Sequence, residues 1–204
     1  MKKNIYYLYI APALSILIPT PARLAYGIIL LLELNFLVLL GSLPQSMIKH
    51  FNVNEFSKPL SFIFLISFVI IFRQLVSLYS PLIANTLYLN FYLTSIASFP
   101  MVLFSDDEIT EMSLKVRLKL GLKYSLKFTL FGILYFLLRD LISFGTVTLP
   151  GRYQLYEYVI FKKLYENNSF FWNSIPFGLV LIAVFLAIAT YIQKKFDIVR
   201  RAQV

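Results

Sequence analysis

The sequence contains no cysteine and a single histidine, His50. Without thiols the chain cannot form disulfides, thiolate metal sites or cysteine-ligated iron–sulfur clusters. One histidine cannot make a histidine metal cluster, and it lies in a polar stretch between apolar segments. We therefore expect no cofactor and no metal bound by this chain.

Charged residues are also scarce. They make up 14% of the 204 residues, whereas 59% of the residues are hydrophobic and the mean hydropathy is +0.74. A water-soluble domain carries about 25% charged residues, so this chain lacks the polar surface to cover itself. Composition therefore predicts a polytopic membrane protein, a single domain over 1–204 with the lipid bilayer as its surroundings.

Acidic residues are outnumbered, ten against nineteen basic residues, which gives a net charge of +9. The basic residues flank apolar runs instead of forming a stripe, a pattern typical of membrane topology and not of phosphate binding. The chain also lacks a phosphate-binding loop, a nucleophile–base arrangement and paired catalytic carboxylates. We expect no nucleic-acid partner and no catalytic activity of its own.

Six apolar segments predict an all-α protein with six transmembrane or half-transmembrane helices. The segments are 5–18, 22–43, 59–79, 82–104, 121–145 and 172–192. A helix needs about 20 apolar residues to cross a bilayer, so the first segment, broken by Pro12, is expected to be a half-helix or broken helix. A signal peptide is the alternative for this segment, but Pro12 and the span that follows at once disfavour it.

The fourth segment is less uniformly apolar than the others. It contains Asn85, Asn90, Thr94, Ser95 and Ser98, with Pro100 near its end. Polar residues of this kind in a span usually face protein, so a second broken helix is expected here.

Three connecting stretches carry their own predictions. Residues 44–57 read as a polar turn, and 105–108 as a capping box that starts a short surface helix. In 150–171, Tyr153, Tyr156 and Val159 recur at helical spacing with Ile160 and Leu164, which predicts an interfacial helix.

The basic residues also predict the orientation. Six segments place thirteen of them on the side of the termini: Lys2, Lys3, Lys49, Lys58, Lys115, Arg117, Lys119, Lys123, Lys127, Lys194, Lys195, Arg200 and Arg201. Six fall on the other side: Arg23, Arg73, Arg139, Arg152, Lys162 and Lys163. The positive-inside rule then predicts an inner-membrane protein with both termini cytoplasmic. A short broken segment followed by two longer spans occurs twice, which suggests two inverted three-helix repeats, about 5–79 and 82–195.

Several short motifs resemble the RnfE/NqrD-type subunits of the Rnf and Nqr electron-transport complexes. Residues 138–146, Leu-Arg-Asp-Leu-Ile-Ser-Phe-Gly-Thr, are similar to that family's L-R-E-I-I-G-N-G-T at the end of its fifth helix. Lys58-Pro59-Leu60 resembles its I-P-I at the start of helix three, and Ser169-Phe170-Phe171 also fits. The resemblance covers nearly the whole chain, and it depends on the order and spacing of these motifs together. The resemblance implies an ion-translocating complex with other membrane subunits as partners.

The chain departs from that family at the cluster ligands. In the family, breaks in helices one and four each supply a cysteine, and these hold a [2Fe–2S] cluster together with a paralogous partner. Here residues 10–14 correspond to the first break, with Ala11 at the cysteine position. Residues 92–98 correspond to the second, with Ser98 at that position. Neither side chain can replace a thiolate on iron, so the resemblance implies the fold without the cluster.

Charged residues inside apolar segments are the candidate functional site. Glu33 lies near the middle of the second segment, Arg73 in the last third of the third, and Arg139-Asp140 close to the end of the fifth. An intramembrane carboxylate suggests a functional site with a partner to be named. Three interpretations of Glu33 are open: a structural ion pair with Arg73, a protonated carboxyl group, or part of an ion pathway. Asp140 is an alternative partner for Arg73.

Neighbours on a helix do not face each other, so Arg139 and Asp140 are each expected to meet another helix. The hydroxyl residues Thr94 and Ser95 complete the candidate set, either as part of a polar path or as interhelical hydrogen-bond donors.

Three functions remain open at this stage. The chain is expected to be a non-redox structural subunit of a membrane complex. The alternative is a small membrane transporter that uses Glu33 and the polar fourth segment. A third possibility is an electron-transport subunit whose cluster is ligated wholly by a partner.

Overall fold

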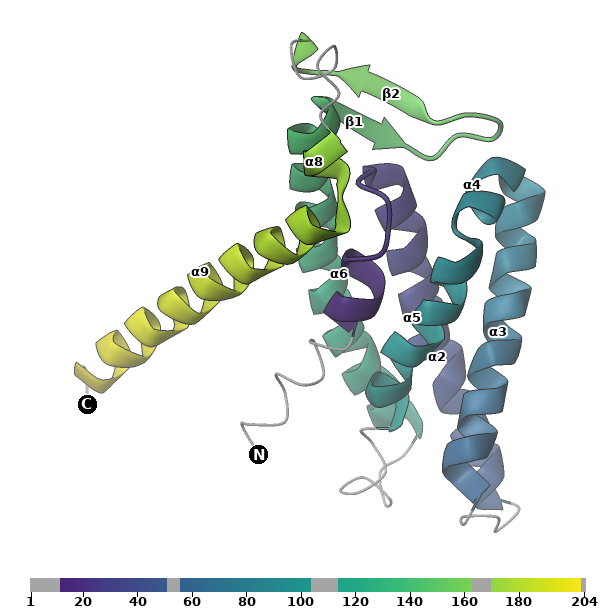
Figure 1. Ribbon diagram of the computed structural model, residues 1–204. Coiled ribbons are helices and arrows are strands. Elements are labelled where there is room, and N and C mark those ends of the chain that lie inside the picture. The colour runs from purple at the N-terminus through teal and green to yellow at the C-terminus, as the bar shows by residue number, and fades with distance from the viewer. Residues whose placement is uncertain (1–11, 51–55, 104–113, 163–169, 203–204) are drawn as a thin grey trace.

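The computed structural model describes residues 12–50, 56–103, 114–162 and 170–202, and these residues are mostly helical (Figure 1). The helices are η1 (Ala13–Leu17), α2 (Leu24–His50), α3 (Ser57–Tyr79), α4 (Pro81–Thr86), α5 (Tyr88–Leu103), α6 (Leu114–Phe144), α8 (Phe170–Asn173) and α9 (Ile175–Ala202). Two strands, β1 (Thr146–Leu149) and β2 (Tyr156–Val159), form an antiparallel hairpin across one end of the helical bundle.

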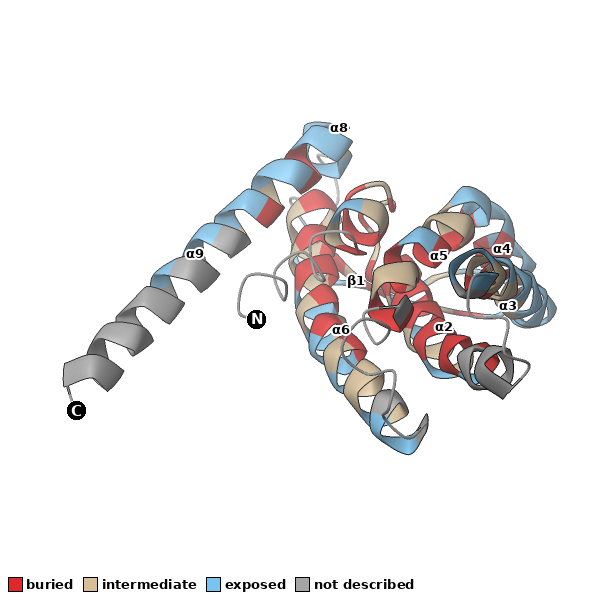
Figure 2. Ribbon diagram, turned by 90° about the horizontal axis from the view of Figure 1, so that it is seen from below, coloured by how far each residue is buried: buried red, intermediate tan, exposed pale blue. Residues whose placement is uncertain are grey.

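Helix α2 lies at the centre of the bundle and packs against α3, α5 and α6. Leu30, Leu34 and Leu37 of α2 are fully buried, and Figure 2 shows the buried positions of α2, α5 and α6 gathered in the interior. At Gly27 a Cβ atom would lie 2.2 Å from the ring of Phe136. Glycine is therefore needed there for α2 to approach α6 this closely.

Within the part of the chain that the structure describes, two helices are long and apolar enough to cross a membrane. The candidate spans are Leu24–Pro44 in α2 and Lys58–Tyr79 in α3, and Ile175–Phe185 in α9 is a shorter apolar helix. In the most apolar stretch of α2, 67% of the residues are buried, against 22% in α3. Helix α2 therefore serves as core, whereas α3 presents most of its apolar surface outward (Figure 2).

The first apolar segment does not form a continuous helix within the described residues. One five-residue π-helical turn, η1, begins after Pro12, and the chain is irregular from Ile18 until α2 begins at Leu24. Helix η1 packs against α5, so a piece of the first segment lies beside a piece of the fourth.

The fourth segment is also interrupted, but not where the sequence suggested. The interruption falls at Leu87, between α4 and α5, whereas residues 92–98 are continuous helix and Pro100 lies inside α5. The prediction of a break at 92–98 was wrong. The hydroxyl groups there donate to carbonyl oxygens of their own helix, so their polarity is compatible with an unbroken helix.

Two of the connecting stretches differ from expectation. In the described part of 150–171 the expected interfacial helix is not formed, because β2 pairs Tyr156 with Leu149 and Val159 with Thr146. Residues 163–169, including Leu164, lie outside the described residues. Aromatic and β-branched residues favour strands, and an antiparallel partner outweighs a helical spacing seen in one segment alone. The all-α prediction was therefore wrong in this stretch. The expected polar turn at 44–57 was also wrong in its first half, because α2 continues through Pro44 to His50. The capping box at 105–108 lies outside the described residues.

Candidate functional site

Helix α6 ends directly before a glycine, Gly145. Gly145 adopts a φ of 66°, and its N–H donates to the carbonyl oxygen of Leu141 at 2.9 Å. The carbonyl oxygen of Gly145 accepts from the N–H groups of Ile160 and Phe161, at 2.8 and 2.9 Å. A left-handed residue after a helix is the usual glycine stop, and here it also fixes the hairpin against the end of α6.

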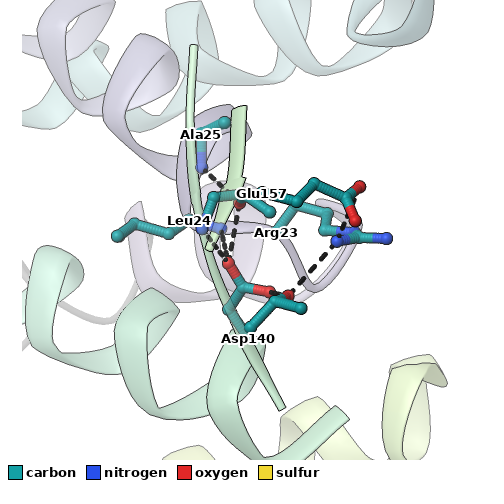
Figure 3. A network of polar contacts seen from close by, with 7 residues as sticks. Arg23, Leu24, Ala25, Asp140 and Glu157 are labelled. Atoms are coloured by element: carbon teal, nitrogen blue, oxygen red, sulfur yellow. Dashed lines mark hydrogen bonds and ion pairs between the residues drawn. The ribbon is translucent and has the colours of Figure 1, made fainter. Parts of the chain in front are cut away.

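Asp140 is fully buried one turn before this stop, and its carboxylate accepts hydrogen bonds from backbone N–H and hydroxyl groups (Figure 3). Oδ2 accepts from the backbone N–H of Leu24 at 3.1 Å and from the N–H and hydroxyl of Thr148 at 2.9 and 2.7 Å. Oδ1 accepts from the hydroxyl of Thr146 at 3.0 Å. The carboxylate thus binds the first residue of α2 and the strand β1 together.

The location of Asp140 explains why a buried carboxylate is tolerated. The first N–H groups of a helix have no intrahelical partner, and the helix dipole places partial positive charge there. Leu24 is such a position in α2, and the next N–H, of Ala25, donates to the hydroxyl of Thr148 at 3.2 Å. Asp140 and Thr148 therefore satisfy the start of α2 from outside the helix.

Arg139 is 1% exposed and binds carbonyl oxygens. Its Nη1 donates to the carbonyl oxygens of Leu17 and Thr20, both at 2.9 Å. Longer contacts of 3.4 to 3.5 Å reach the carbonyl oxygens of Ile18, Asn173 and Ser174. The guanidinium group thus joins the end of η1 to the turn between α8 and α9.

Together, Arg139 and Asp140 satisfy the two sides of one chain interruption. Arg139 binds carbonyl oxygens where η1 ends, and Asp140 binds an N–H group where α2 begins. A cation suits the carbonyl end of a helix and an anion suits its amino end, so each charge matches the backbone group it contacts. As predicted, the two side chains face different neighbours; both neighbours belong to the same break.

Arg23 extends this cluster to the hairpin. Its Nη1 lies 3.1 Å from Glu157 Oε1 in β2 and 3.3 Å from Thr146 Oγ1 (Figure 3). Its guanidinium carbon lies 3.9 Å from the ring centroid of Phe144. Arg23 was not among the candidate residues predicted from the sequence. Its position between Pro21 and the first apolar residues of α2 suggests only a flanking charge.

Glu33 lies elsewhere, on α2 in the bundle interior, and its environment is different. It is 0% exposed, and neither carboxyl oxygen has a hydrogen-bond partner among the described residues. The hydroxyl of Thr94, itself fully buried in α5, is a polar neighbour of this carboxyl group. That hydroxyl donates its proton to the carbonyl oxygen of Phe91 at 2.6 Å.

The ion pairs expected for Arg73 are not formed in the described part of the chain. Arg73 Nη1 donates to the hydroxyl of Tyr92 at 3.4 Å, and its guanidinium carbon lies 4.2 Å from the ring centroid of Tyr88. Both the Glu33–Arg73 and the Asp140–Arg73 predictions were therefore wrong. Aromatic groups of α5 lie within reach of the guanidinium, and Asp140 is surrounded by backbone and hydroxyl donors instead.

The hydroxyl residues of the fourth segment mainly satisfy their own helix. The hydroxyls of Ser95 and Ser98 donate to the carbonyl oxygens of Tyr92 and Ser95, at 2.6 and 3.0 Å. Asn90 Nδ2 donates to Thr20 Oγ1 at 3.1 Å, which links α5 to the irregular stretch between η1 and α2. Ala11, at the other cysteine-equivalent position, lies outside the described residues.

No protein-family model, curated protein or solved structure matches this chain.

Proposed function

We propose that the chain is a multi-pass inner-membrane protein with cytoplasmic termini that serves as a non-redox structural subunit of a membrane complex. In this proposal its six apolar segments form two inverted three-helix repeats, as the resemblance to RnfE/NqrD-type subunits implies. The support is architectural: a short first segment lies against an interrupted fourth segment, beside the central helix α2.

The observation that carries this proposal is the use made of Arg139 and Asp140. Charges inside an apolar segment are expensive and usually mark a pathway or site. Here both side chains are bound to backbone groups of the chain itself, at the interruption between η1 and α2. They hold a broken segment in place, which favours a structural role over catalysis.

Surface chemistry supports an apolar environment. Large apolar residues are exposed along α3, namely Ile63, Ile70, Ile71, Leu75 and Leu78. A water-soluble monomer seldom exposes so continuous an apolar surface. Lipid or the apolar helices of neighbouring subunits would cover it.

The absence of cysteine allows a direct test of the membrane arrangement. Single substitutions Lys115→Cys, Leu130→Cys and Tyr153→Cys place one thiol at exposed positions in early α6, in mid-α6 and in the hairpin loop. In intact cells a membrane-impermeant maleimide should label Tyr153→Cys alone. After lysis it should also label Lys115→Cys.

Leu130→Cys separates a membrane protein from a water-soluble one. Leu130 is 75% exposed, so its thiol would react quickly in a soluble protein. In a bilayer it faces hydrocarbon and should stay unreactive until the protein is denatured in detergent. Rapid labelling at this position in native membranes would contradict the proposal.

The subunit role is tested by purifying a tagged chain from native membranes and identifying its companions by mass spectrometry. A stable set of membrane companions is expected. If the interruption between η1 and α2 shapes the surface that binds them, Arg139→Ala should lose these companions. Purification as a lone chain would contradict the subunit role. Iron content and optical spectra of the complex would reveal a cluster held at this chain.

Glu33 favours a second candidate, a small transporter. A fully buried carboxyl group without a hydrogen-bond partner among the described residues is the one intramembrane charge that the fold does not use. Ion-dependent flux in vesicles containing the chain alone, lost in Glu33→Gln, would support transport. Unchanged flux in that variant would exclude a role for the carboxyl group.

A further inference from the structure

The hydrogen-bonding capacity around Glu33 restricts the form of its carboxyl group. An ionised carboxylate only accepts hydrogen bonds, whereas a protonated one donates one. The Thr94 hydroxyl has a single proton, and that proton is already given to the carbonyl oxygen of Phe91. Thr94 Oγ1 can therefore accept from Glu33 but has no proton left to donate to it.

The charged groups on the surrounding elements do not offer a counter-ion. Arg73 of α3 contacts Tyr88 and Tyr92, and Arg139 of α6 contacts backbone carbonyl oxygens. Lys123 and Lys127 of α6 are exposed. Asp140 is surrounded by its own donors. Among the described residues, an ionised Glu33 would thus be a buried charge without a partner, which is strongly unfavourable.

The same surroundings disfavour a metal ion. Among the described residues no three His, Asp or Glu side chains come together as a metal site. The neighbouring hydroxyls of Ser95 and Ser98 are bonded within α5. A proton is the one cation that needs only a single carboxyl group and a single acceptor.

We propose that Glu33 and Thr94 form a proton-binding site between α2 and α5. The Glu33 carboxyl group holds the proton and donates a hydrogen bond to Thr94 Oγ1, whose own O–H donates a hydrogen bond to the carbonyl oxygen of Phe91. The ligand of this site is H⁺. The proposal does not depend on the subunit role, and it names the coupling ion if the transporter candidate is correct.

Infrared spectroscopy of the purified full-length chain in phosphatidylcholine vesicles tests the site at neutral pH. The wild-type minus Glu33→Gln difference spectrum should contain the C=O stretching band of a protonated carboxyl group. Glu157→Gln is the matched control, because Glu157 is partly exposed and paired with Arg23. Its difference spectrum should contain carboxylate bands only.

Thr94 provides a second readout in chains that retain Glu33, so the test survives if Glu33→Gln does not fold. Thr94→Val removes the acceptor and should shift the carboxylic-acid band to higher wavenumber, whereas Thr94→Ser should leave it in place. Incubation in D₂O should shift the band to lower wavenumber as the bound proton exchanges.

Four results would overturn the proposal. They are a carboxylate band in place of an acid band for Glu33, an acid band that persists in Glu33→Gln, an acid band unmoved by Thr94→Val, and a band that never responds to D₂O. The last would show a locked structural acid and not a binding site. None of these results depends on companion subunits or on flux, so failure here is distinguishable from failure of either proposed function.

Discussion

Among the described residues, Asp140 and Glu33 are the two carboxyl groups that are completely buried, and their surroundings are opposite in kind. Asp140 accepts hydrogen bonds from Leu24, Thr146 and Thr148, whereas Glu33 has no hydrogen-bond partner in the described part of the chain. The difference follows from position along neighbouring helices. Asp140 faces the start of α2, where backbone N–H groups are free, while Glu33 lies where every backbone N–H is already used within a helix. A carboxylate can be structural at a helix end, but in mid-helix it needs a proton or a cation.

The largest effect should come from Asp140→Ala. It leaves the backbone N–H groups of Leu24 and Thr148 buried without an acceptor, so we expect a loss of about 3–5 kcal/mol in the free energy of unfolding. Thermal unfolding in detergent, followed by the fraction of monodisperse protein, measures it. Asp140→Asn keeps one acceptor oxygen, so its free energy of unfolding should lie between those of Asp140→Ala and the wild type. A melting temperature equal to wild type would remove the distinction between the two carboxyl groups.

Arg139→Lys tests the other side of the same break. An ammonium group is a point charge without the guanidinium fork, so it cannot bind the η1 carbonyl oxygens and the α8–α9 turn at once. We expect a loss of about 2–3 kcal/mol, with faster amide hydrogen exchange at 20–25. Equal exchange in the variant would show that Arg139 does not hold the interruption.

A smaller effect is expected for Thr148→Val. The backbone N–H of Thr148 still donates to Asp140, but the hydroxyl bond and the acceptor for the N–H of Ala25 are lost. The expected loss is about 1–2 kcal/mol in the free energy of unfolding. Denaturant titration measures it, with Thr148→Ser as the control that should restore most of the stability.

The smallest effect should be that of Glu33→Gln. The glutamine amide can donate to Thr94 Oγ1 as a protonated carboxyl group does, so the change in unfolding free energy should stay within about 1 kcal/mol. Thermal unfolding beside Asp140→Ala gives the direct comparison. If Glu33→Gln proved as harmful as Asp140→Ala, Glu33 would be an ionised structural group, and the contrast between the two carboxyl groups would disappear.

Much of the helix pattern was predictable because it follows from apolar runs alone. The segments at 22–43, 59–79 and 121–145 each lie on a helix. The hairpin was not predictable from its own residues, because helical spacing and strand preference coexist in 150–171 until β1 supplies a partner. The interruption at Leu87 was missed for a related reason: no glycine or proline marks it within the segment.

The candidate site was predictable as a set of residues but not as a set of contacts. Burial of Glu33, Arg139 and Asp140 follows from charges placed inside apolar segments. The predicted ion pairs assumed that each buried charge binds a side chain of opposite charge. In the structure, Arg139 and Asp140 bind backbone groups instead.

The sequence by itself determined that apolar helices would dominate, that this chain supplies no thiolate ligand, and which few charges would lie inside apolar segments. Only the tertiary structure decided what each buried charge meets, since Leu24, which binds Asp140, and Leu17, which binds Arg139, lie more than a hundred residues away along the chain. Composition and periodicity report how much surface must be covered. Which free backbone ends are brought against a side chain depends on how the helices pack.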